Sequence, residues 1–164
     1  RGNLKRYIQT HLEEFISNLY EQLGIFKPYQ ISEEFIANKL GIMFFRENGP
    51  SFHTRICGTD VIYIDARLPP KKQREQFFHE LCHVLRHVGN QSFISLSFRE
   101  WQEIDARRFT KCAAIPFDMV KDWNLWDENI IEKASDIFCV TEELCEQRLL
   151  QIKNRIYFNL TRIS

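Results

Sequence analysis

The sequence predicts a mostly helical α+β domain with a small three-stranded sheet packed beside one of its helices. Apolar residues recur at helical spacing at both ends of the chain, and short alternating segments typical of strands lie between residues 41 and 65. The 164 residues are 44% hydrophobic and 13% aromatic, which suits one compact domain over residues 1–164. Within it, 1–118 would hold the first helices, the sheet and two central helices, and 119–164 a helical subregion resembling a helix-turn-helix.

Two helices are expected before the sheet. Residues Leu4–Leu23 place apolar side chains at helical spacing and are followed by Gly24, a residue type that commonly ends helices. Ser32 is a suitable N-cap for a second helix, which should end near Gly41.

Three strands are expected next. They cover Gly41–Phe45, Phe52–Cys57 and Val61–Asp65. The glycine-containing turn at 58–60 predicts that the last two strands form a hairpin.

A His-Glu-x-x-His motif, His79 to His83, organises the chain around one helix. Residues four apart lie nearly above one another on an α-helix, so both imidazoles can reach one metal ion. Glu80 is rotated by about 100° from His79, which leaves its carboxylate beside the metal face, where a general base is useful. Apolar residues gather on another face of this helix, as expected for a helix at the edge of a core, and the motif therefore predicts a metal-dependent hydrolase.

Two histidines need a third protein ligand to hold a catalytic zinc ion. The helix expected over Trp101–Ile115 offers Glu103, which shares its face with small residues that permit close approach of a neighbouring helix. Glu103 is therefore preferred to Asp105 and Glu100. His87 follows one turn after His83, where it could line the cleft or bond a backbone carbonyl.

The segments HELCHVLRH and EIDARRFTKCAAIP resemble the ImmA/IrrE metallopeptidases, whose pattern is a HELxH helix followed by E-x-x-A-x-x-F-A and a proline turn. The resemblance implies a zincin-like fold in which His79, His83 and Glu103 bind Zn²⁺ and Glu80 is the general base. The same ligand types also accept Mn²⁺ or another divalent ion. Thr110, which stands where alanine is usual, is not one of the proposed ligands.

The resemblance also implies a narrow substrate. The expected partner is a cytoplasmic helix-turn-helix transcriptional repressor, cleaved to release genes of a phage, mobile element or stress regulon. An edge strand beside the metal, either Val61–Asp65 or Phe52–Cys57, would bind the peptide in extended form. Tyr63 and His53 are candidates for a proton donor or for stabilising the oxyanion of the transition state.

Ile130–Phe138 and Glu142–Leu150 have the layout of a helix-turn-helix themselves. The second helix begins with acidic residues, which oppose binding to a polyanion, and the formal net charge is +0 with a pI of about 7.1. We therefore expect no direct nucleic-acid binding. The helical pair is expected to pack on the catalytic unit or to dock a protein substrate.

Apolar runs and cysteine content bear on where the protein is expected to act in the cell. No apolar run reaches the length of a membrane span, so no membrane association is expected. The five cysteines are odd in number and irregularly spaced, which indicates free thiols in the cytoplasm. The first residue is Arg rather than Met, which is consistent with a missing native N-terminus.

The alternative function is a non-catalytic anti-repressor or binding module that sequesters a regulator and keeps a metal for stability. The presence of Glu80 favours the enzyme, because a structural metal site needs no general base.

Overall fold

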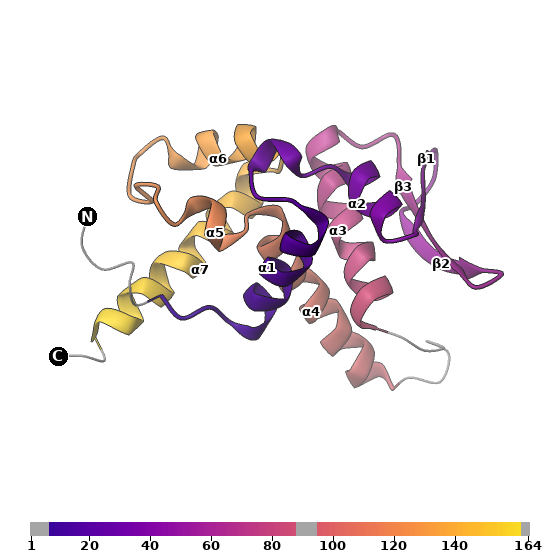
Figure 1. Cartoon of the computed structure of the whole chain (residues 1–164), viewed down its shortest axis with the longest axis horizontal. Coiled ribbons are helices and arrows are strands. Elements are labelled where there is room, and N and C mark those ends of the chain that lie inside the picture. Colours follow the sequence, from indigo (N-terminus) through magenta and orange to yellow (C-terminus); the bar gives the residue numbers. More distant parts are fainter. Residues whose placement is uncertain (1–6, 88–94, 162–164) are drawn as a thin grey trace.

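The computed structural model describes residues 7–87 and 95–161 and confirms the α+β class (Figure 1). Helices α3 and α4 lie side by side at the centre, with the sheet at one end of the molecule and helices α5, α6 and α7 toward the other. Among the described residues, none of the helices has both the length and the apolar character needed to cross a bilayer. The elements are α1 (His11–Leu23), a 3-10 turn η2 (Pro28–Gln30), α2 (Glu33–Lys39), β1 (Met43–Glu47), β2 (Phe52–Ile56), β3 (Thr59–Asp65), α3 (Pro70–Arg86), α4 (Leu96–Ala114), α5 (Phe117–Val120), α6 (Ile130–Phe138) and α7 (Glu142–Thr161).

Helix α1 begins later than the apolar pattern predicted. Thr10 is its N-cap: the Thr10 hydroxyl accepts a hydrogen bond from the Glu13 amide, and the Glu13 carboxylate accepts one from the Thr10 amide. This capping box starts the helix at His11, and residues 7–10 are not helical; the predicted positions 4–6 lie outside the described residues. Gly24 ends the helix in the left-handed conformation, as expected.

The sheet has the order β1-β3-β2, with β1 parallel and β2 antiparallel to the central strand. Cys57 and Gly58 form the hairpin turn with φ values of 49° and 79°, so the turn lies one residue earlier than predicted and β3 begins at Thr59. Because β3 is central, the prediction that Val61–Asp65 could be an edge strand is wrong. The edge beside α3 is β2, Phe52–Ile56.

The hydrophobic core is continuous from the sheet through α3 and α4 to α1, α6 and α7. Phe77, Phe78 and Leu81 of α3 are fully buried, and Phe44 of β1 packs edge-on against Phe77. Helix α4 begins at Leu96, five residues before the predicted start, because Ser95 provides an N-cap that accepts from the Phe98 amide. Small buried side chains continue along α4 toward its end (Ala106, Ala113 and Ala114).

The C-terminal helical pair packs against the start of α3. Arg74 donates to the carbonyl of Phe138 at 2.8 Å, and the Thr141 amide donates to the Glu75 carboxylate at 3.0 Å. Helix α6 has the predicted bounds, whereas α7 extends eleven residues beyond the predicted Leu150, to Thr161. The first turn of α7 is thereby fixed beside α3.

Candidate metal centre

The structure brings His79, His83 and Glu103 together at the surface between α3 and α4. The Glu103 carboxylate oxygens lie 3.1 Å from Nε2 of His79 and 3.0 Å from Nε2 of His83, and the two Nε2 atoms are 3.3 Å apart. The His83 side chain is 4% exposed, that of His79 30% and that of Glu103 51%. The cluster is therefore anchored in the core on one side and open on the other.

These separations suit one small divalent cation. Zinc binds histidine nitrogen and carboxylate oxygen at about 2.0–2.2 Å in tetrahedral geometry, so its ligand atoms stand roughly 3.3–3.5 Å apart. Burial lowers the pKa of His83, although the Glu103 carboxylate acts in the opposite direction. Burial thus favours the neutral imidazole, which is the form that binds a metal. The set of two imidazoles and one carboxylate fits zinc and accepts other divalent ions.

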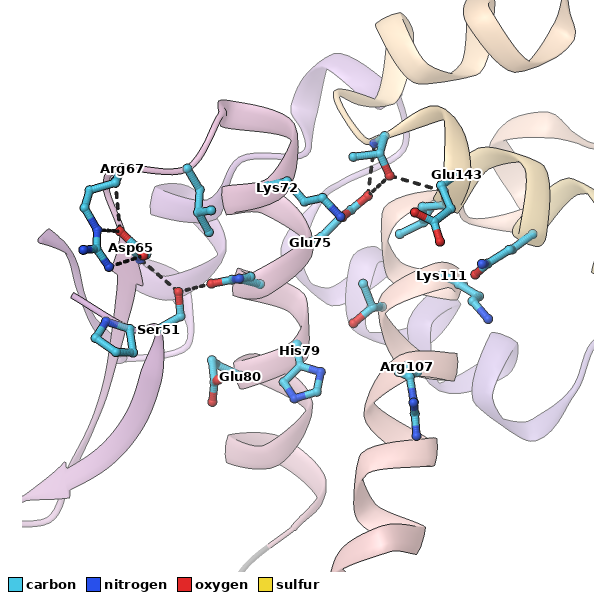
Figure 2. A pocket seen from close by; sticks show the side chains of 17 residues that line it. Ser51, Asp65, Arg67, Lys72, Glu75, His79, Glu80, Arg107, Lys111 and Glu143 are labelled. Carbon is cyan, nitrogen blue, oxygen red and sulfur yellow. Dashed lines mark hydrogen bonds and ion pairs between the residues drawn. The ribbon is translucent and has the colours of Figure 1, made fainter. Parts of the chain in front are cut away.

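Glu80 lies next to this cluster but is not part of it. Its side chain points toward the sheet, whereas that of His79 points toward α4 (Figure 2). The Glu80 carboxylate accepts a hydrogen bond from Nδ1 of His53 on β2 at 2.5 Å, and the His53 ring stacks on the His83 ring with centroids 5.2 Å apart. His53 is therefore positioned to hold the Glu80 carboxylate at the edge of the metal cluster.

His87 occupies a second layer behind the cluster. Its Nδ1 lies 2.9 Å from Nδ1 of His83, and its Nε2 lies 2.8 Å from the Asp105 carboxylate. Arg86 donates two further hydrogen bonds to Asp105, at 3.0 and 3.2 Å. Of the two roles expected for His87, the bond to a backbone carbonyl is not formed, because His83 and Asp105 satisfy its two ring nitrogens, whereas the ring does line a cleft beside β2.

Cys82, His87 and Asp105 also lie close enough together to form a second metal-ligand cluster. Burial and the neighbouring Asp105 carboxylate raise the pKa of the Cys82 thiol, whereas a metal binds the thiolate. Burial opposes ionisation of Asp105, yet the hydrogen bonds from Arg86 and His87 hold the pKa of Asp105 below its ordinary value. Asp105 is thus already neutralised by a guanidinium, so this group serves as a support for the first cluster.

Tyr63 does not approach the centre. On β3 it is aligned with Phe52 and Phe45 of the neighbouring strands, and its ring stacks on both of theirs, with centroids 4.7 and 5.3 Å apart. His53 is aligned with the next residue, Ile62, and so lies on the other sheet face, toward α3. The prediction of Tyr63 as a proton donor is therefore wrong, because side chains alternate between the faces of a strand.

Two clefts adjoin the cluster. The larger, of about 700 Å³, includes His79 and Glu80 and extends between α3, α4 and the first turns of α7 (Figure 2). The smaller, of about 220 Å³, is lined by His53 and other residues of the β2–β3 hairpin and by His83 and His87. A polypeptide crossing the cluster would thus find space on both sides of it.

The sequence does not predict that the Asp105–Arg86 pair supports His87. It presents Asp105 only as an alternative ligand to Glu103, whereas the structure brings Glu103 to His79 and His83 and pairs Asp105 with Arg86. The spacing of His83 and His87 on one helix was the signal for their contact. No pattern in α3 could indicate which residue of another helix would bond the second ring nitrogen of His87.

A His-Glu-x-x-His helix beside a small sheet, with a carboxylate from a neighbouring helix, is typical of metallopeptidases. The model of the peptidase M78 family, described as the IrrE N-terminal-like domain, matches residues 37–150. The chain therefore belongs to this metal-dependent peptidase family.

Two relatives from Bacillus subtilis (strain 168) are similar over most of the chain. The phage-like element PBSX protein XkdA is 34% identical over 148 residues, which cover 89% of this chain and 75% of XkdA. The protein YqaB is 32% identical over 146 residues, which cover 88% of this chain and 85% of YqaB. No solved structure matches the chain significantly.

Proposed function

We propose that this protein is a zinc-dependent endopeptidase in which His79, His83 and Glu103 hold the metal and Glu80 is the general base. The observation that carries the proposal is the convergence of the three ligand atoms at 3.0–3.3 Å while Glu80 stays outside the cluster. Membership of a peptidase family supports the same reaction class.

A divalent ion held by His79, His83 and Glu103 would supply Lewis-acid polarisation of the attacking water and of the substrate carbonyl. Glu80 accepts a proton from that water at a carboxylate oxygen as the oxygen attacks the peptide carbon. Glu80 then delivers the proton to the departing amine nitrogen, so the C–N bond breaks without release of an unstable anion. His53 orients Glu80 through the 2.5 Å hydrogen bond from Nδ1 and is the remaining candidate for stabilising the oxyanion.

The edge strand β2 supplies the means of holding an extended peptide. Within the part of the chain that the structure describes, β2 pairs with β3 alone, and its His53 side chain faces Glu80. Backbone groups on the other side of β2 can add a substrate strand next to the metal cluster. This arrangement supports binding of an unfolded or locally opened segment of a protein.

The proposed substrate is a helix-turn-helix transcriptional repressor of a phage or other mobile element, cleaved in the cytoplasm to relieve repression. The resemblance to the ImmA/IrrE metallopeptidases supports this choice. The similarity to a protein named for the phage-like element PBSX supports the genetic setting.

The test is incubation of the zinc-loaded protein with a panel of purified repressors from phage-like elements, followed by mass spectrometry. The parent should cleave one repressor at a defined bond, and Glu80→Gln should retain metal and fold but cleave at least about 10²-fold more slowly. A reporter of repression is measured in parallel. If Glu80→Gln relieved repression as well as the parent does, the alternative, a non-catalytic module that sequesters the regulator, would replace the enzyme.

A further inference from the structure

Two cations on α4, Arg107 and Lys111, line the larger cleft. Arg107 and Lys111 follow Glu103 by four and eight residues, so the three side chains lie along one side of the helix. Figure 2 shows Arg107 across from His79 and Lys111 further along α4, toward α7. Within residues 7–87 and 95–161, neither cation has an ion-pair or hydrogen-bond partner.

Most other charged groups of this cleft are already paired within the protein. The pairs are Arg67 with Asp65 at 2.9 Å, Lys72 with Glu75 at 3.5 Å, and His53 with Glu80 at 2.5 Å. Glu143 is the remaining acid of the lining, and it lies on α7 at the end of the cleft away from His79. Next to the metal cluster, the α4 wall therefore presents the cation Arg107, whereas Lys111 lies further along, toward the end of the cleft that also holds Glu143.

The pKa of Lys111 reflects both its burial and the repulsion between the two cations. Burial lowers the pKa of Lys111, and the positive charge of Arg107 lowers it further. A carboxylate placed between or beside these groups would relieve this unfavourable interaction and form charge-assisted hydrogen bonds.

The spacing of the cations matches an extended peptide. Four residues of α-helix advance about 6 Å along the axis. Two residues of extended chain advance about 6.6 Å, and residues two apart point to the same side. Arg107 thus stands about two peptide residues from Glu103, and Lys111 about two residues further.

We propose that Arg107 and Lys111 form a subsite for acidic substrate residues, binding carboxylates two and four positions to one side of the scissile bond. The inference rests on the proposed peptidase function, because the substrate positions are counted from the scissile bond, which would lie at the metal cluster. The substrate class is a segment of Asp or Glu at alternate positions, adjoining the bond that is cut.

Binding is tested with fluorescein-labelled, alanine-based decapeptides that carry either Glu or Gln at two alternate positions. Anisotropy titrations use the zinc-loaded Glu80→Gln chain, which holds peptides without turning them over. The Glu peptide should bind about tenfold tighter than the Gln peptide in low salt, and the ratio should decrease as salt increases. Arg107→Gln combined with Lys111→Gln should bring the ratio to about one.

The matched control is Arg108→Gln, because Arg108 is an exposed cation of the same helix that does not line the cleft. It should leave the ratio unchanged. Arg107→Glu combined with Lys111→Glu should instead prefer a Lys peptide. Equal affinities for the Glu and Gln peptides in the Glu80→Gln chain, or a preference that survives loss of both cations, would overturn the subsite.

Cleavage of a proteome-derived peptide library by the zinc-loaded parent separates this inference from the proposed function. Acidic residues should be enriched at the second and fourth positions on one side of the cut. Cleavage without that enrichment would overturn the subsite but would support the proposed peptidase function. Acid-selective binding without any cleavage would overturn the peptidase and retain the anionic binding site.

Discussion

The Nδ1 atoms of His83 and His87 face each other at 2.9 Å, so one of these two nitrogens donates a hydrogen to the other. If Nε2 of His83 binds a metal, its Nδ1 must carry the hydrogen and donate it to His87. His87 then carries its own hydrogen on Nε2 and donates it to the Asp105 carboxylate at 2.8 Å. The three side chains form a directed chain of hydrogen bonds that ends at a carboxylate held by Arg86.

This chain predicts that His87 tunes metal affinity without touching the metal. Replacing His87 with Phe keeps an aromatic ring but removes the acceptor for His83, so zinc affinity should fall about 10–100-fold. Asp105→Asn retains an oxygen acceptor for His87 without the charge and should have a smaller effect. Competition with a chromophoric chelator measures both affinities, and affinities equal to the parent's in both variants would contradict a supporting role.

Substitutions of His53 and Tyr63 should differ in their effects on catalysis. Side chains alternate between the two faces of a strand, and the pairing of β2 with β3 places His53 and Tyr63 on opposite faces of the sheet. His53→Phe removes the group that orients Glu80 and should lower kcat about 10–100-fold with metal content unchanged. Tyr63→Phe should leave kcat at the parent value. Steady-state cleavage of a peptide substrate measures both, and a larger loss in Tyr63→Phe would contradict the placement.

A buried ion pair between Glu13 on α1 and Arg148 on α7 should be important for stability. Their side chains are 4% and 3% exposed and lie 3.2 Å apart, and Arg148 also donates to the carbonyl of Ile115 at 2.9 Å. Arg148→Met leaves the Glu13 carboxylate buried without its cation and should cost about 3–5 kcal/mol of unfolding free energy. Urea denaturation measures the loss.

The double variant Glu13→Gln with Arg148→Met provides the control for that prediction. It removes both charges, so it should be more stable than Arg148→Met alone. A double variant that is less stable than Arg148→Met would show that packing, rather than the unpaired charge, causes the loss.

The Asp65–Arg67 pair predicts a specific acid dependence of stability. Hydrogen bonds from Arg67 lower the pKa of Asp65 from 3.8 to about 2. Since the folded value lies below the unfolded one, the pair stabilises the fold above about pH 4 and loses that contribution as the pH falls toward 2. In Asp65→Asn, the unfolding free energy should therefore depend less on pH between 2 and 4 than in the parent, as measured by urea denaturation at each pH. Equal slopes would contradict the assignment.

The helical spacing of His79, Glu80 and His83, and the placement of Glu103 among small residues, were sufficient to predict which side chains meet. These inferences depend on the geometry of single helices, which is regular. Tyr63 could not be placed in the same way, because its face depends on the hairpin turn at Cys57 and on the pairing of β1 with β3, which brings distant residues together. Register of this kind is set by tertiary packing.

The start of α1 and the partner of His87 illustrate two further limits. Apolar spacing continued upstream of His11, but the Thr10 capping box decided where the helix begins. The support for His87 comes from Asp105, which lies on another helix, so its role depends on how α3 and α4 dock.

Zinc content per chain after dialysis, measured by elemental mass spectrometry, tests the central claim most directly. The parent and Glu80→Gln should each retain about one ion per chain, whereas His79→Ala should retain close to none, because two remaining ligands do not hold zinc tightly. Retention of zinc by His79→Ala at the level of the parent would contradict the assignment of the metal to His79, His83 and Glu103.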